Sequence, residues 1–413
     1  MASVKRKIGI VGAGQAGLQL GCGLLDKGYD VYIVQERSGE EIAKGKVTSS
    51  QCMFDIALQN ERDLGLNFWD DACPTVDSIN FVVPAPNGSG NKAIEWNGKL
   101  DRPAQSVDQR VKFPAWMKEF ERRGGHLKIK DVGVLEADCR AREFDLVVVA
   151  AGKGDIAKLF ERDAAKSPFA KPQRALALTY VHGMKPREGH SAVNFNLIPT
   201  VGEYFVFPAL TLSGPCEIMV FEGVPGGPMD CWKDVKTPAE HLAQSLKILE
   251  TFLPWEADRC RAVELTDANG IVSGAFAPIV RKPIARLPSG KAVLGLADAV
   301  CLNDPITGQG SNSASKAAKI YLDAIVAHGD RPFDEAFMQA TFDSYWAYAQ
   351  FVTGWTNALL QPPPPHVLNL MGAAQGLPAL AKRIANGFDE PRDLFPWFAV
   401  PEEAEKYLQQ LAA

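Results

Sequence analysis

The sequence predicts an α/β fold with a doubly wound parallel sheet, a second mixed sheet interleaved with it along the chain, and helices toward the C-terminal end. Two observations support this. A strand–helix–strand pattern occupies the first 35 residues, and a stretch that alternates apolar and polar residues separates later strands of the same kind. The length of 413 residues exceeds the size, about 250–300 residues, at which a single core stops growing. We therefore expect two or three domains.

The first unit has an apolar run at 8–11, helical spacing of apolar residues over 15–25, and a β-branched run at 31–34. This order is typical of two parallel strands joined by a helix. The later runs 145–150 and 292–296 have the continuous apolar character of strands buried on both faces. The doubly wound sheet is therefore expected to be assembled from segments far apart in the sequence.

Residues 176–225 alternate apolar and polar residues, with proline and glycine at the turns, which favours antiparallel strands. A helix is predicted over 238–252. Helices are also predicted over 334–355 and near 402–411, and the four prolines at 362–365 are interpreted as a rigid, non-helical connector between helices.

These patterns predict a division into three parts. The first domain comprises residues 1–70, 105–175 and 275–330, the second comprises 71–104 and 176–274, and the C-terminal helical region comprises 331–413.

Composition and charge exclude several classes of protein. Hydrophobic residues make up 46% and charged residues 23% of the chain, which is ordinary for a globular protein. The net charge is −5, and no basic stretch could follow a nucleic-acid backbone. No apolar run approaches the roughly 20 residues of a membrane span, and no signal sequence is evident. We expect a cytoplasmic protein that binds neither nucleic acid nor membranes.

The histidines and cysteines show no pattern of a metal or redox site. None of the six histidines has the spacing of a zinc ligand, and no two cysteines are separated by two residues. No metal is expected. The cysteines are expected to be reduced and mostly buried; they are Cys22, Cys52, Cys73, Cys139, Cys216, Cys231, Cys260 and Cys301.

The segment Gly12-Ala13-Gly14-Gln15-Ala16-Gly17 follows the first strand and opens the first helix, as the dinucleotide fingerprint requires. Its first glycine makes the turn, the second lets a pyrophosphate approach the backbone, and the third lets the helix pack on the strand. Glu36 follows Gly17 by 19 residues, where a carboxylate can bind ribose hydroxyls. The predicted dinucleotide site comprises Gly12, Gly14, Gln15, Ala16, Gly17 and Glu36. The alternative is a glycine-rich turn without a ligand.

The segment from Gly39 to Lys46 imitates a phosphate-binding loop. It has five residues between its glycines instead of four, and Val47 stands where that loop needs a hydroxyl group. We interpret it as a turn beside the cofactor, with Lys46 near a phosphate.

A second motif follows the strand at 292–296. Ala297-Asp298 ends that strand, and Asp304-Pro305-Ile306-Thr307-Gly308-Gln309-Gly310-Ser311-Asn312 leads into a helix. Together with the fingerprint, this motif resembles the flavoprotein monooxygenases of the glutathione-reductase-like fold, whose Rossmann domain binds FAD. The resemblance implies FAD as the cofactor, with Asp298 at the ribityl chain; the alternative for Asp298 is an ordinary loop residue. It adds to the cofactor site Pro305, Gly308, Gln309, Gly310 and Asn312.

The strand at 145–150 leads into Gly152-Lys153-Gly154, and Gly152 is assigned to the cofactor site. Single-component aromatic hydroxylases commonly carry an Asp-Gly pair here, which serves the nicotinamide nucleotide as well as the flavin. The absence of that pair predicts that the protein receives reduced FAD from a separate NADH-dependent flavin reductase.

Four stretches narrow the resemblance: Glu36-Arg37, Ser49-Ser50-Gln51-Cys52-Met53, Ser106-Val107-Asp108-Gln109-Arg110, and Asp304-Pro305 before Gly308-Gln309-Gly310. With them the whole chain resembles the epoxidase component of two-component styrene and indole monooxygenases. This implies diffusible reduced FAD as the cofactor and O₂ as a co-substrate, and it adds Arg37 to the cofactor site. The first domain is then the FAD-binding domain and the second the substrate domain.

The styrene branch of that family carries Asn, Val and His, then Tyr and His, then Ser at its pocket positions. This sequence carries instead Ser49, Gln51, Met53, Val76, Ile79 and Ala104. That set matches the indole branch and, with Pro305, is the predicted substrate pocket. The apolar members would contact a flat aromatic ring, and Ser49 or Gln51 could accept a hydrogen bond from the indole N–H. Without the family resemblance, ordinary core residues are the preferred interpretation.

The expected reaction is the epoxidation of indole across its C2=C3 bond, leading to indoxyl and indigo, with styrene-like alkenes and sulfides as further substrates. No side chain is nominated as a catalytic acid or base. The alternatives are a styrene monooxygenase, a single-component NAD(P)H-dependent aromatic hydroxylase and a nucleotide sensor without enzymatic activity. A homodimer is compatible with the sequence.

Overall fold

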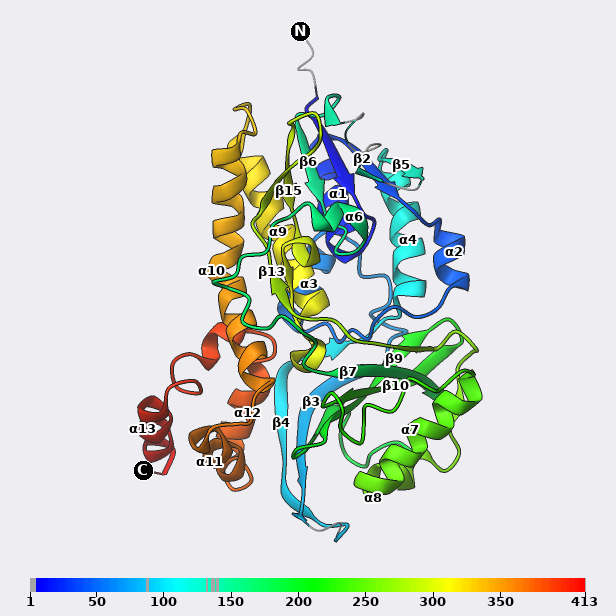
Figure 1. Ribbon diagram of the computed structural model, residues 1–413, viewed down its shortest axis with the longest axis vertical. Coiled ribbons are helices and arrows are strands. Elements are labelled where there is room, and N and C mark those ends of the chain that lie inside the picture. The colour runs from blue at the N-terminus through cyan, green and yellow to red at the C-terminus, as the bar shows by residue number, and fades with distance from the viewer. Residues whose placement is uncertain (1–4, 87–88, 131–132, 135–137, 139–140, 413) are drawn as a thin grey trace.

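The computed structural model describes residues 5–86, 89–130, 133–134, 138 and 141–412 (Figure 1). Two large sheets occupy the upper and lower halves of the molecule, and helices flank both (Figure 1). This is the α/β arrangement that the sequence predicts.

The upper sheet has six strands in the order β14-β15-β6-β1-β2-β5. All neighbours are parallel except β14 and β15. Its interior is apolar and fully buried, as at Ile8, Val148 and Leu294. The strands are β1 (Lys7–Val11), β2 (Asp30–Gln35), β5 (His126–Ile129), β6 (Leu146–Val149), β14 (Ile284–Arg286) and β15 (Ala292–Gly295).

Helices pack against this sheet and against one another. Helix α1 contacts both α4 and α9, and α9 contacts α10. A Cβ atom on Gly23 would lie 2.5 Å from Cδ2 of Leu322, so α1 and α9 can approach closely only because α1 has a glycine there. The helices are α1 (Gln15–Asp26), α2 (Gly39–Lys44), α3 (Asp55–Asp63), α4 (Gln109–Arg122), α6 (Gly154–Lys158), α9 (Gly310–His328) and α10 (Glu335–Leu359).

The lower sheet is mixed, in the order β11-β7-β10-β9-β8-β3-β4, and β12 also pairs with β7. Its neighbours are antiparallel except β3 and β8, which are parallel. The strands are β3 (Thr75–Pro84), β4 (Lys92–Gln105), β7 (Ala175–His182), β8 (Ala192–Ile198), β9 (Gly202–Thr211), β10 (Gly214–Gly223), β11 (Glu264–Leu265) and β12 (Ile271–Gly274).

The two faces of the lower sheet are covered by different elements because side chains alternate along a strand. Met219 and Phe221 of β10 pack with residues of α7 (Pro238–Phe252) and α8 (Pro254–Ala257). Ile218 and Val220 pack in the opposite core, which includes Trp355 of α10.

The C-terminal region adds three further helices, α11 (Pro365–Ala373), α12 (Pro378–Asn386) and α13 (Pro401–Ala412). Helix α12 packs on β4, where a Cβ on Gly98 would lie 2.2 Å from the carbonyl oxygen of Ala381. The predicted non-helical connector at 362–365 is wrong at its last residue. Pro365 begins α11, because the first position of a helix needs no N–H donor.

Several short elements complete the chain. Strands β13 and β16 pair with each other. Of the single-turn helices, η2 follows α8, η3 precedes β16, η4 follows β16, and η5 lies between α12 and α13. Their bounds are β13 (Ile279–Val280), β16 (Cys301–Leu302), η2 (Asp258–Cys260), η3 (Ala297–Ala299), η4 (Pro305–Thr307) and η5 (Pro391–Leu394).

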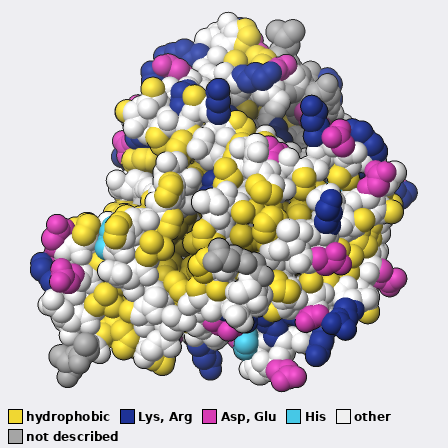
Figure 2. Space-filling view, turned by 60° about the horizontal axis from the view of Figure 1, so that its bottom comes forward, with side chains coloured by type: hydrophobic (Ala, Val, Ile, Leu, Met, Phe, Trp, Pro, Cys, Tyr) yellow, Lys and Arg dark blue, Asp and Glu magenta, His cyan; other side chains and the backbone are white. Residues whose placement is uncertain are grey.

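The described cysteines are all free thiols, and all but the half-buried Cys231 are buried; Cys139 lies outside the described residues. Within the described part of the chain no helix combines the length and the apolar character that crossing a membrane demands. Apolar side chains gather on the lower face (Figure 2). Leu368 and Val400 are among the large apolar side chains that the C-terminal region exposes.

Candidate active site

The fingerprint loop lies between β1 and α1. Gly12 has φ +105°, and a Cβ on Gly17 would lie 2.0 Å from the carbonyl oxygen of Gly12, so both glycines are required by the fold. A Cβ on Gly14 would meet nothing within 4 Å. The first turn of α1 contains no acidic residue, which leaves its positive end unneutralised. The open space above Gly14 therefore fits a pyrophosphate.

Two other fingerprint residues point inward. The amide of Gln15 donates to Oε1 of Glu61 at 2.9 Å, and Glu61 pairs with Nζ of Lys112 at 2.6 Å. Ala16 is buried. These buried side chains stabilise the fingerprint loop from the interior of the protein. Sequence reasoning missed Gln35, whose Oε1 accepts a hydrogen bond from the Ala13 N–H at 3.0 Å.

Glu36 and Arg37 are exposed directly after β2, and Lys46 is exposed after α2. The interpretation of residues 39–46 as a turn is wrong for most of the segment, because Gly39–Lys44 is helix α2. Ser38 and Glu41 form a capping box at its start, which stabilises even a short helix.

The loops after β6 and β15 touch each other. A Cβ on Gly152 would lie 2.5 Å from Cβ of Asp298. Ala297, just before Asp298, has φ +53°, a strained conformation for alanine. Asp298 is exposed to solvent, where an aspartate carboxylate is ionised at neutral pH and can accept hydrogen bonds from a polyol chain.

The turn before α9 joins two predicted parts of the site. Asn312 donates to the carbonyl oxygens of Cys52 and Gly308 at 2.8 and 3.0 Å, and its Oδ1 accepts from the N–H of Phe54 at 2.8 Å. A Cβ on Gly308 or Gly310 would meet nothing within 4 Å. Asn312 therefore fastens the 52–54 segment beside a turn with open space over its glycines.

The Gln309 side chain does not face that open space. It is fully buried, and its amide donates to the carbonyl oxygen of Phe388 at 2.7 Å. Gln309 thus anchors the turn to the C-terminal region, while Pro305 is half-buried at the start of η4.

Most of the predicted pocket residues lie together, but Met53 does not. Val76 pairs with Ala104 across β3 and β4, and both pack with Ile79, Cys52 and other apolar residues in one core. Met53 pairs through its backbone with Gln105 at 2.8 and 3.0 Å.

The side chain of Met53 packs in a separate cluster with Ala57 and Leu58. Cys52 and Phe54, which flank Met53, belong to the core that holds Val76. Sequence reasoning overlooked these two residues, although alternation along an extended segment could have indicated them.

A polar group borders this core. The Ser49 hydroxyl donates to Oε1 of Gln51 at 3.1 Å, and the Gln51 amide donates to the carbonyl oxygen of Val107. The hydroxyl of Tyr180, which is fully buried, donates to the carbonyl oxygen of Ser49 at 2.9 Å. Tyr180 was not predicted, because its contact spans 131 residues and its own strand pattern marks it only as core.

The stretch at 106–110 forms a buried ionic network. Arg110 is 3% exposed and donates to Asp108 at 2.8 and 2.9 Å and to Asp267 at 3.0 Å. Thr211 donates to the same Asp108 carboxylate at 2.6 Å. The network fixes the start of α4 to β9 and to the loop before β12, so these residues support the site rather than open into it.

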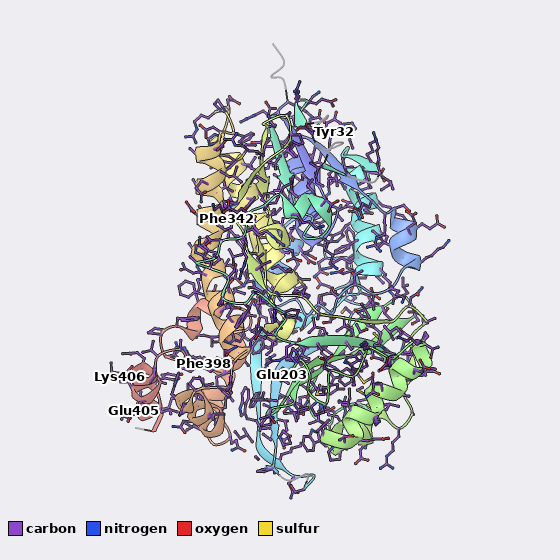
Figure 3. All side chains as sticks on the ribbon, viewed as in Figure 1. Tyr32, Glu203, Phe342, Phe398, Glu405 and Lys406 are labelled. Atoms are coloured by element: carbon purple, nitrogen blue, oxygen red, sulfur yellow. The ribbon has the colours of Figure 1, made fainter. Side chains whose placement is uncertain are left out.

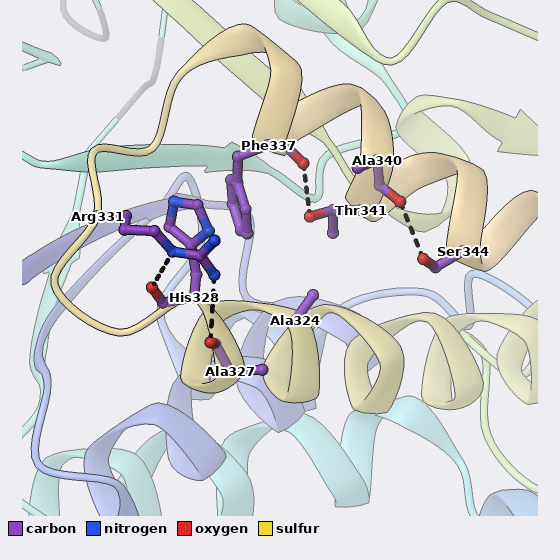
Figure 4. A pocket seen from close by; sticks show the side chains of 8 residues that line it. All are labelled: Ala324, Ala327, His328, Arg331, Phe337, Ala340, Thr341 and Ser344. Carbon is purple, nitrogen blue, oxygen red and sulfur yellow. Dashed lines mark hydrogen bonds between the residues drawn. The ribbon is translucent and has the colours of Figure 1, made fainter.

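A separate hollow of about 180 Å³ lies between α9 and α10 (Figure 4). It is lined near the C-terminal end of α9 by Ala324, Ala327 and His328, whereas the turn at Gly308 lies at the other end of that helix. A helix rises about 1.5 Å per residue. The hollow therefore lies roughly 20 Å along α9 from the turn at Gly308.

The chain is similar to several known proteins. A family model described as "Styrene monooxygenase A putative substrate binding domain" matches residues 152–259. Styrene monooxygenases StyA of Pseudomonas fluorescens and of a Pseudomonas species are each 30% identical over 420 residues, covering 99% of this chain and 99% of the relative.

Among solved structures, the flavin-dependent brominase Bmp2 has a TM-score of 0.67 at 15% identity, covering 98% of this chain and 100% of its own. The flavin-dependent halogenase CmlS has a TM-score of 0.63 at 16% identity, covering 98% and 70%. These likenesses confirm the predicted glutathione-reductase-like fold. With the full-length identity to StyA, they lead to one conclusion: the chain belongs to the styrene monooxygenase StyA family and is a flavin-dependent monooxygenase.

Proposed function

We propose that this protein is the oxygenase of a two-component system that takes reduced, diffusible FAD from a separate NADH-dependent reductase and epoxidises indole with O₂ in the cytoplasm. The full-length relatives named styrene monooxygenase support the epoxidase activity. They support styrene as a substrate equally well, so a styrene monooxygenase is the second candidate. Related alkenes and sulfides would enter the same apolar pocket.

One observation carries the proposal. Asn312 ties Cys52 and Phe54 to the turn at Gly308, so the predicted substrate segment adjoins the predicted flavin turn. FAD would be held by the fingerprint loop and Glu36, by Gly152 and Asp298, and by the turn. When bound, the flavin supplies the oxygen chemistry.

The residues of this chain orient the substrate and exclude water. Val76, Ile79 and Ala104 are buried apolar neighbours, which favour a flat aromatic ring over a charged molecule. Ser49 and Gln51 offer oxygen acceptors that indole, with its N–H, can use and styrene cannot. We propose no catalytic acid or base.

The domain division is part of the proposal. The segments 1–70, 105–175 and 275–330 would form the FAD-binding domain, 71–104 and 176–274 the substrate domain, and 331–413 the helical region. The two sheets support this division. The homodimer stays a prediction, to be tested by light scattering.

Ser49→Ala is expected to lower kcat/KM for indole about 2–10-fold, because one hydrogen bond contributes about 0.5–1.5 kcal/mol. The kcat/KM for styrene should not change. The measurement is paired initial rates on both substrates with a flavin reductase present. Ser50→Ala is the matched control. It should have the same ratio of kcat/KM for indole to kcat/KM for styrene as the wild type. A wild type that prefers styrene, or a ratio unmoved by Ser49→Ala, would favour the second candidate.

Without a reductase, the purified protein is expected to oxidise neither NADH nor NADPH in the presence of FAD and indole. The reason is that Gly152-Lys153-Gly154 replaces the Asp-Gly pair of single-component enzymes. Nucleotide oxidation is followed by absorbance, and adding any flavin reductase should start indigo formation. Rapid bleaching of FAD by NADH with this chain alone would contradict the two-component proposal.

A further inference from the structure

Four ionisable side chains meet in the interior below the turn that precedes α9. Glu203 of β9 and Glu222 of β10 are cross-strand neighbours, Arg174 precedes β7, and Asp304 precedes η4. All four are buried, with Glu222 0% and Asp304 1% exposed. Glu203 lies in the middle of the molecule, where the lower sheet approaches the upper half (Figure 3).

The single cation of this group is directed at one carboxylate. Nε and Nη2 of Arg174 donate to the two oxygens of Glu203 at 2.7 and 2.9 Å. Its Nη1 donates to the carbonyl oxygens of Gln173 and Leu360 at 2.8 and 3.4 Å. Within the described residues, neither carboxyl oxygen of Glu222 receives a hydrogen bond from an N–H or O–H donor.

Glu222 instead meets Asp304. Both carboxyl oxygens of Glu222 and Oδ2 of Asp304 are buried without a donor among the described residues, and the two carboxyl groups interact with each other in the same interior. Two ionised carboxylates cannot form a hydrogen bond, because both only accept, whereas one proton between them allows an O–H···O bond. Desolvation raises the pKa of Glu222 well above its ordinary value and that of Asp304 to about 6. The contact is therefore favourable only while the pair holds a proton.

Asp304 also shapes the turn. Its Oδ1 accepts a hydrogen bond from the Ile306 N–H at 3.2 Å and caps η4. Gly308 closes the same turn with φ +63°, and its carbonyl oxygen binds Asn312. Any displacement of Asp304 would move Pro305 and the start of α9.

We propose that Glu222 and Asp304 are positioning residues that share one proton and thereby hold the turn Asp304–Gly308 against β10. This rests on the proposed function, because it takes the turn to face the flavin. When the proton is lost, the two carboxylates are both negatively charged and repel each other. Arg174 cannot neutralise them, because it is already paired with Glu203. The turn then separates from β10, and the surface for FAD is no longer held in place.

The test measures the affinity of the full-length protein for oxidised FAD between about pH 6 and about pH 9 by flavin fluorescence, which needs no turnover. Above the pH at which the pair loses its proton, the Kd of the wild type should rise by about tenfold per pH unit, as the competent fraction falls. Glu222→Gln and Asp304→Asn each supply a permanent N–H donor to the remaining carboxylate. Both variants should therefore bind FAD with an affinity that does not depend on pH.

Glu217→Gln is the matched control. Glu217 lies on the opposite face of β10, where desolvation raises its pKa to about 7 near Arg259 and Arg187. This variant should keep the pH dependence of FAD affinity that the wild type shows. If it flattened the curve as well, the dependence would not belong to the pair.

Unfolding curves give an independent readout. An acid with a raised pKa binds its proton more tightly in the folded state, so its contribution to stability falls as the pH rises from its ordinary pKa to the folded one. Glu222→Gln should lose less stability than the wild type over that interval. If the Kd for FAD changed with pH in the same way in the wild type and in both amide variants, the proposal would be overturned. Absence of FAD binding at every pH would contradict the proposed function itself, and the unfolding curves would then decide whether the proton is shared.

Discussion

A Gly14→Val variant is expected to fold normally and to lose FAD affinity by about 100-fold. A Cβ at this position meets no protein atom within 4 Å, and Gly14 has φ −90°, so the fold accepts a side chain. The proposed pyrophosphate would occupy the same space. Overpacking costs about 1–3 kcal/mol, and the cost should be near the upper end because Gly12 and Gly17 of the loop are already in close contact. A loss of about 100-fold in Kd corresponds to that energy.

The measurement is FAD titration by fluorescence, combined with thermal unfolding of the apoprotein. Gly17→Ala provides the contrast, because its Cβ would lie 2.0 Å from the carbonyl oxygen of Gly12. That variant should lower the unfolding temperature even without FAD. An unchanged Kd for Gly14→Val would mean that the fingerprint does not bind the cofactor.

Glu61→Ala is expected to destabilise the protein by about 3–5 kcal/mol, since it leaves the ammonium of Lys112 buried and unpaired. The two side chains are 1% and 2% exposed and 2.6 Å apart. Gln15 contacts both of them, with its Oε1 3.4 Å from Nζ of Lys112. The loss should therefore reach the fingerprint loop as well as the fold.

The stability of this pair is best measured by urea unfolding of Glu61→Leu, of Lys112→Met and of their combination, which form a double-mutant cycle. Combining Glu61→Leu with Lys112→Met removes both charges and should recover most of the stability lost in Glu61→Ala. Asp155→Ala breaks the exposed ion pair with Lys158 and should leave the midpoint unchanged. Equal midpoints for Glu61→Ala and the wild type would show that Lys112 finds another partner.

The sequence located those helices and strands whose capping residues, turns and apolar spacing lie within one short segment. The helix predicted over 238–252 is α7, Pro238–Phe252, because Thr237 and Glu240 form a capping box and a proline follows the cap. The strand–helix–strand unit at the start was found for the same reason: its turn, its helix and its two strands lie within 35 residues.

Long-range contacts could not be predicted in this way. The parallel pairing of β3 with β8 joins residues more than 100 positions apart. The local antiparallel pair of β3 and β4 was overlooked. Tyr180 reaches Ser49, and Glu222 meets Asp304, only after the lower sheet has packed below the turn before α9. Met53 was grouped with Val76 by resemblance, but the backbone alternation at 52–54 turns its side chain to the other side.

The strand order of the upper sheet has a consequence for how the chain matures on the ribosome. Strand β6 lies between β1 and β15, and β15 begins only at Ala292. Until that residue has left the exit tunnel, one edge of β6 has no partner, and the turn at Gly308 does not yet exist. At about 5–20 residues per second, this interval lasts many seconds. For most of its synthesis the nascent chain therefore exposes an apolar strand edge on β6 that a chaperone can recognise.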